Sequence, residues 1–92
     1  MRIRFLEAAQ REVDDAVTWY NQREEALGFE FLDELDRSIR RIKSFPLGSP
    51  EVEPGIRRCL LARLIYGIDE DLIIVVAVPH LHRNPRYWID RL

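Results

Sequence analysis

Cysteine and lysine are almost absent from this 92-residue chain, which has one of each, Cys59 and Lys43. A single cysteine cannot form an internal disulfide and argues against a zinc site, which agrees with a reducing cytoplasm. The longest apolar run, residues 72–79, is far too short to span a membrane. Charged residues among the first seven positions leave no room for the apolar core of a signal peptide, so we expect none. These absences favour a small cytoplasmic protein without a cofactor.

Size and charge narrow the class further. A chain of this length forms one domain, residues 1–92, and buries only about 60–70% of its unfolded surface, so a partner can matter. The net charge of −2 is not the positive footprint of a nucleic-acid-binding domain, and we expect no direct sequence-specific DNA binding. Thirteen of the fourteen basic residues are arginine. A GC-rich genome would account for this excess, but arginine pairs could still bind phosphates or carboxylates.

The first half of the chain is predicted to be a strand followed by a helical hairpin. Residues 2–6 alternate polar and apolar side chains, as a short strand does. Apolar residues then recur every three or four positions over residues 9–20 and again over 32–42, the pattern of two amphipathic helices. Gly28 stands where the first helix would be capped, and Pro46 cannot continue the second.

The second half is predicted to be a loop and three strands. Glycine and proline assign residues 46–55 to the loop. Strands are expected at about 56–63, 64–69 and 72–80, with a turn at residues 69–71.

The strand over residues 72–80 is predicted to be the central strand of the sheet. Its run 72–78 does not alternate, so both faces must be covered and the strand should be central. The order β-αα-βββ predicts an α+β fold, in which an N-terminal strand and a helical hairpin are followed by a mostly antiparallel three-stranded sheet.

Chemically capable side chains are densest in residues 79–88, PHLHRNPRYW. This segment contains His80, His82, Arg83, Arg86, Tyr87 and Trp88. One interpretation is an RNA-cleaving site, in which histidine or tyrosine transfers protons and arginine holds the phosphate. In the structural alternative, the histidines bond strand-end backbone groups and the tryptophan fills the core. A His-x-His metal site would lack neighbouring Cys, Asp or Glu ligands.

Three further features carry expectations about single residues. Arg57 and Arg63 share a face of the predicted strand but lie roughly 20 Å apart, so they cannot hold one phosphate without a bulge. Trp19 and Tyr20 are adjacent on a helix, so at most one fits the core stripe and the other could cover a partner surface. Trp88 should close the end of the sheet against the helical hairpin.

Together, these segments resemble the RelE/ParE toxins, also called plasmid stabilisation proteins, over nearly the whole chain. The tightest likeness lies in three strings, IRRCLLAR, LIYGIDEDLIIVVAV and HLHRNPRYW. The last is similar to the closing motif of a ParE-like subgroup, His-x-x-Arg followed by Pro-x-Tyr-Trp. The resemblance implies the toxin of a type II toxin–antitoxin module, silenced by a cognate antitoxin that wraps it with its C-terminal segment.

Two activities occur among such toxins. RelE-like members cut messenger RNA on the ribosome, whereas ParE-like members poison DNA gyrase without covalent chemistry. Carried over by position, the residues of an RNase would be Arg58 (or its neighbour Arg57), His80, Arg83 and Tyr87. The candidates for binding the target or the antitoxin are Trp19, Tyr20, Arg57, Arg63 and Arg86.

The chain also departs from the subgroup. It lacks the usual Phe-Pro-Tyr-Gly insertion between Arg63 and Leu64, and Gly67 stands where an arginine often follows the tyrosine. The lysines typical of ribosome-dependent RNases are missing as well. We therefore expect gyrase inhibition, with two alternatives: a ribosome-dependent endoribonuclease, or a harmless homologue that only binds its antitoxin. Whether the chain is an enzyme stays open at this point.

Overall fold

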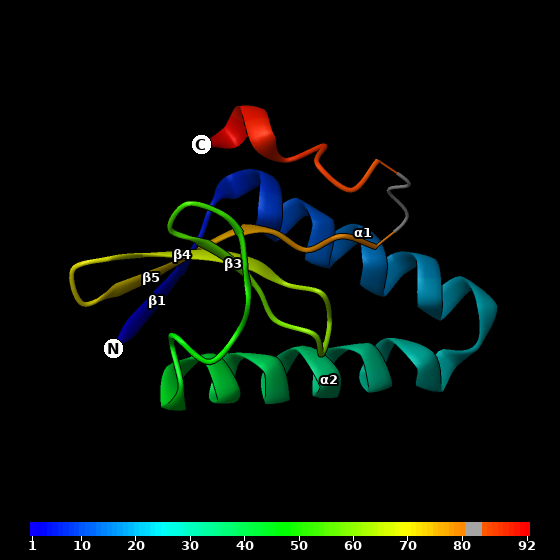
Figure 1. Ribbon diagram of the computed structural model, residues 1–92. Coiled ribbons are helices and arrows are strands. Elements are labelled where there is room, and N and C mark those ends of the chain that lie inside the picture. Colours follow the sequence, from blue (N-terminus) through cyan, green and yellow to red (C-terminus); the bar gives the residue numbers. More distant parts are fainter. Residues whose placement is uncertain (81–83) are drawn as a thin grey trace.

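A computed structural model describes residues 1–80 and 84–92 of the chain (Figure 1). In chain order, the elements are β1 (Arg2–Phe5), α1 (Glu7–Arg23), α2 (Glu25–Ser44), β2 (Glu51–Glu53), β3 (Ile56–Arg58), β4 (Ile65–Asp69), β5 (Leu72–Ala77) and a 3-10 helix, η1 (Ile89–Arg91). This is the predicted α+β fold, with the predicted helical hairpin between the first strand and the remaining strands.

The sheet has five strands in the order β1-β5-β4-β3-β2, two more than the predicted three-stranded sheet. β1 joins it as an edge strand parallel to β5, and the other neighbours are antiparallel. The prediction that β5 is central is confirmed, because it pairs with β1 on one side and β4 on the other. β2 lies within residues 46–55, which we predicted to be a loop because of their prolines and glycines. A short edge strand tolerates flanking prolines, so those residues did not exclude a strand there.

The sequence suggested that Gly28 caps the first helix, and this prediction was wrong. α1 ends at Arg23, a single residue separates the helices, and Gly28 lies in the first turn of α2. A Cβ atom on Gly28 would stand 2.1 Å from Oδ1 of Asn21 on α1. The glycine therefore leaves room for the Asn21 side chain where the hairpin turns.

The main core lies between the helical hairpin and one face of the sheet. Its buried side chains come from α1, α2, the sheet and the ends of the β3–β4 connection, namely Ala9, Val13, Leu35, Ile42, Cys59, Leu64, Tyr66, Ile73, Val75 and Val78. The predicted apolar stripes of both helices supply the helical half of this core. An exception is Leu32, which is 38% exposed.

A second, smaller core lies on the opposite face of the sheet. Trp88, only 1% exposed, packs there against Ile65, Val76 and Ala77. In Figure 1 the C-terminal segment (red) and α2 (green) lie on opposite sides of the strands. The prediction that Trp88 is buried is confirmed, but its expected place against the hairpin was wrong, because the chain turns back over the other face of the sheet.

Two strands, β3 and β5, are shorter than predicted. β3 ends at Arg58, since the backbone N–H of Cys59 donates to the carbonyl of Leu64 (2.8 Å) and closes a turn. Arg63 has a φ of 54° in that turn, so it shares no strand face with Arg57. β5 ends at Ala77, because the N–H of Val78 donates to a side chain of α1 and not to the sheet.

Candidate functional site

A buried carboxylate on α1, Glu12, holds the C-terminal segment. It accepts hydrogen bonds from the N–H of Val78 (3.0 Å), the hydroxyl of Tyr87 (2.6 Å) and Nη1 of Arg91 (2.8 Å). The same Arg91 nitrogen also donates to the carbonyl of Val76 (3.1 Å). Glu12 is 9% exposed, so water reaches little of its charge, and the paired Arg91 guanidinium helps to stabilise it.

Tyr87 is one of the residues to which the RelE resemblance gave a catalytic role. Its surroundings determine whether its hydroxyl can release a proton. The ring is half-buried in the second core, and its hydroxyl donates to Glu12. Burial raises the pKa of Tyr87, and the hydrogen bond to the Glu12 carboxylate raises it further. The phenol therefore holds its proton far above neutral pH.

We expect Tyr87→Phe to lower the free energy of unfolding by about 1.5–3 kcal/mol, the range for a hydrogen bond to a charged group. Because the folded-state pKa of Tyr87 is raised, its contribution to stability is complete below the unfolded value of about 10 and declines as pH rises beyond it. Urea unfolding at neutral and alkaline pH measures both effects. A variant as stable as the wild type at every pH would contradict the role of this hydrogen bond.

His80 lies in an aromatic cluster near the turn that joins the two helices of the hairpin. Its ring centroid is 5.0 Å from that of Trp19, 4.8 Å from that of Tyr20 and 6.2 Å from that of Phe31. Tyr20 also stacks on Phe31, and the guanidinium of Arg23 lies 3.2 Å from the centroid of the Trp19 ring. Both Trp19 and Tyr20 are half-buried, so neither is the freely exposed ring that the helical pattern suggested.

A polar hollow of about 240 Å³ opens beside this cluster. Tyr20, Glu34, Arg63 and His80 are among the residues that line it. Arg63 is exposed, and within the described residues it forms no ion pair. The structure thus brings together three predicted site residues, Tyr20, Arg63 and His80, which the sequence placed in separate elements.

Two other candidate arginines form contacts within the fold. Arg57 donates from Nη1 to the carbonyls of Ser49 (2.7 Å) and Leu47 (3.2 Å), so it holds the loop that follows α2. Arg86 forms an ion pair with Glu53 on β2.

The three described residues carried over for an RNase, Arg58, His80 and Tyr87, do not form one site. Arg58 is directly opposite Ile65 of the second core in the strand register, so it lies on the face that carries Trp88. Tyr87 belongs to that second core too, whereas His80 packs with the helical hairpin. Arg83 lies outside the described residues.

The described residues contain neither a candidate metal cluster nor a candidate membrane-spanning helix. No three His, Cys, Asp or Glu side chains gather there closely enough to hold a metal ion. Of the helices in that part of the chain, none has the length and apolar character needed to cross a membrane.

Most of the chain matches a known protein family. The family described as "ParE toxin of type II toxin-antitoxin system, parDE" matches residues 3–85. The chain belongs to the ParE toxin family. The family predicted from the three sequence strings is thereby confirmed, and it implies a cognate antitoxin as partner. A search of curated proteins found no match.

The matched part of this ParE-family chain ends before several residues of the site. Tyr87, Trp88 and Arg91 all follow residue 85, while Glu12 lies inside the match. Sequence reasoning missed Glu12, although a signal was present. Glu12 lies three residues after Ala9 and four before Ala16, within the apolar stripe, where a solvated acid is out of place. A charged residue at such a position indicates a buried partner elsewhere in the chain.

Proposed function

We propose that this toxin arrests growth by binding DNA gyrase and does so without cleaving RNA. The observation that carries the proposal concerns the described residues carried over from RelE-like RNases: Arg58, His80 and Tyr87 do not meet at one site. A general acid or base must lie within hydrogen-bonding reach of the reacting atoms while an arginine holds the phosphate. His80 and Arg58 lie on opposite sides of the sheet, and Tyr87 donates its hydroxyl to Glu12.

The hollow beside the aromatic cluster is the best candidate for the target contact. Arg63 offers an exposed guanidinium there, and the half-buried rings of Trp19 and Tyr20 stand close by. Aromatic and arginine side chains dominate the energetics of protein interfaces. The other two binding candidates, Arg57 and Arg86, already form contacts within the chain, so we assign them supporting roles.

Induction of the toxin without its antitoxin should arrest bacterial growth. We expect DNA-damage signalling and filamentation while bulk translation continues, and purified toxin should inhibit supercoiling by purified gyrase. Arg63→Glu should weaken that inhibition by about tenfold or more, because it reverses the charge in the hollow. Lys43→Glu is the matched control, since it makes the same charge change at an exposed position of α2.

Other outcomes would contradict this proposal in distinct ways. An immediate stop of protein synthesis with cut messages would assign the toxin to the ribosome-dependent endoribonucleases. Harmless overexpression of folded protein would favour a homologue that only binds its antitoxin. Supercoiling inhibition equally strong with Arg63→Glu would remove the hollow from the gyrase contact.

A further inference from the structure

The acidic and basic side chains of α2 are separated along the helix. Every charged residue of the first half is acidic, namely Glu25, Glu30, Asp33, Glu34 and Asp36. Every charged residue of the second half is basic, namely Arg37, Arg40, Arg41 and Lys43. The helix dipole favours such a distribution only within the first and last turns. It does not account for Asp33, Asp36 and Arg37, which lie in the middle of the helix.

One face of α2 points away from the rest of the molecule. In Figure 1, the sheet and α1 lie on the same side of α2 (green). On the outward side, Phe29 is 71% exposed, and the side chains of Asp36 and Arg40 are 55% and 77% exposed. The exposed residues that share this side recur every three or four positions, as one face of a helix requires. We call them the outer face of α2: Phe29, Leu32, Asp33, Asp36, Arg40 and Lys43.

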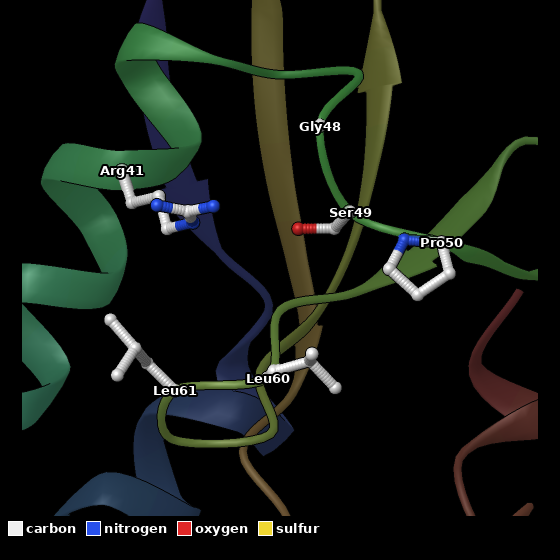
Figure 2. A pocket seen from close by; sticks show the side chains of 6 residues that line it. All are labelled: Arg41, Gly48, Ser49, Pro50, Leu60 and Leu61. Atoms are coloured by element: carbon white, nitrogen blue, oxygen red, sulfur yellow. The ribbon is translucent and has the colours of Figure 1, made fainter.

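Arg41 lies next to Arg40 in the chain but on another side of α2. Figure 2 shows its side chain at a hollow of about 350 Å³, which it lines together with the Gly48-Ser49-Pro50 segment and the β3–β4 connection. Successive residues of a helix are rotated by about 100° from one another, so Arg41 does not belong to the outer face. It carries the same charge at an exposed position of the same helix. An Arg41 variant is therefore a control for charge changes on the outer face.

A second copy of α2 complements the charges of the outer face. Two copies related by a two-fold axis perpendicular to the helix run antiparallel, and every contact between them occurs twice. An axis that crosses α2 between Asp36 and Arg40 sets Asp36 of each copy against Arg40 of the other. The same axis sets Asp33 of each copy against Lys43 of the other. Opposite charges thus meet along the whole stripe, whereas parallel helices would bring like charges together.

The ion pair between Arg40 and Asp36 within one copy does not oppose this arrangement. Their side chains lie 2.9 Å apart and are both exposed, and a single exposed pair contributes little to stability. Across the axis, the pairs of the two copies join into a network of four alternating charges. Such a network stabilises more than isolated surface pairs do.

Exposed apolar residues lie toward both ends of the charged stripe. Phe29 lies near the start of α2, while Phe45 and Leu47, just beyond its end, are 63% and 70% exposed. Antiparallel pairing about the same axis brings Phe29 of each copy to the end of the other copy's α2, where Phe45 and Leu47 follow. Aromatic residues are enriched in protein interfaces. The charged middle of the helix pair therefore has apolar contacts on either side.

We propose that two copies of this chain form a two-fold symmetric dimer through the outer face of α2, with the two helices antiparallel. The complementarity of the helix with itself is what favours a second copy over an unrelated partner. The surface is separate from the proposed gyrase contact. Phe31 and Glu34, the α2 residues that line the hollow beside the aromatic cluster, do not belong to the outer face.

The test measures the dimer dissociation constant of the purified full chain by analytical ultracentrifugation. Asp36→Arg and Arg40→Asp should each weaken self-association by about tenfold or more, because each places like charges together at two symmetric positions. Arg41→Asp makes the same charge change as Arg40→Asp and should dimerise like the wild type. All three positions are exposed, so the melting temperatures should stay unchanged.

Mixing two variants tests the antiparallel pairing itself. Asp36→Arg and Arg40→Asp, each weakened alone, should form a heterodimer with wild-type affinity, because every contact across the axis again joins opposite charges. Asp36→Arg mixed with Arg41→Asp has the same net charges but should form this heterodimer at least tenfold more weakly. In the apolar part, Phe29→Ser should weaken the dimer, whereas Leu92→Ser, at another exposed apolar position, should not.

Three results would overturn the dimer. One is a wild-type chain that sediments as a monomer at every soluble concentration. Another is self-association that Asp36→Arg and Arg40→Asp leave unchanged, which would place the interface elsewhere. The third is a failure of these two variants to form a heterodimer, which would exclude antiparallel pairing. Supercoiling inhibition is a separate measurement, so the dimer and the gyrase proposal can each fail without the other.

Discussion

Replacing Trp88 with alanine is expected to lower the free energy of unfolding by about 3–5 kcal/mol, the range for truncating a buried large aromatic side chain. Trp88 is 1% exposed and is the largest member of the second core. Its indole N–H also donates to the carbonyl of Pro85 (3.1 Å), which ties the ring to its own segment. Chemical denaturation followed by circular dichroism measures the loss.

Trp19→Ala is the matched control for this prediction. It removes the same ring from a half-buried position in the aromatic cluster, so it should cost clearly less stability than Trp88→Ala. Equal losses for the two variants, or an unaffected Trp88→Ala protein, would show that the C-terminal segment does not pack on the sheet as described.

Replacing Glu12 with alanine should cost about 2–4 kcal/mol. The substitution leaves the Arg91 guanidinium, the Tyr87 hydroxyl and the Val78 N–H without their common acceptor. Removing one partner of a fully buried pair costs about 3–5 kcal/mol. We expect somewhat less, since the Arg91 side chain is 23% exposed and water can solvate part of it.

Two variants make this prediction specific. Glu12→Gln keeps one acceptor oxygen and nearly the same shape, so its loss of stability should be smaller than that of Glu12→Ala. Glu7→Ala removes an exposed carboxylate from the same helix, where an ion pair with Arg11 contributes roughly 0–1 kcal/mol. If Glu12→Ala melts like Glu7→Ala, the carboxylate does not hold the C-terminal segment.

Regular local patterns in the sequence determined much of this fold. The apolar stripes of α1 and α2, and the unbroken apolar run of β5, each reflect a repeating geometry that a local stretch of residues reveals. The turn at Glu70-Asp71 and the end of α2 before Pro46 also depend on neighbours in the chain. Three sequence strings were likewise enough to identify the toxin family.

The candidate sites depended on contacts between residues far apart in the chain, so the sequence alone could not assemble them. Glu12 binds Val78, Tyr87 and Arg91, which follow it by 66 to 79 positions, and no local pattern encodes such a pairing.

The path of the C-terminal segment across the sheet decided where several candidate residues lie. Residues 84–92 could have covered either face, because burial of Trp88 is equally favourable wherever apolar surface is open. Only the tertiary structure placed Trp88 on the face of the sheet opposite the main core and turned the Tyr87 hydroxyl to Glu12 of α1. It left His80 among the aromatic rings of the hairpin. Sequence alone thus determined the family and the order of elements, whereas the separation of the candidate residues was decided by which surfaces the packed core left uncovered.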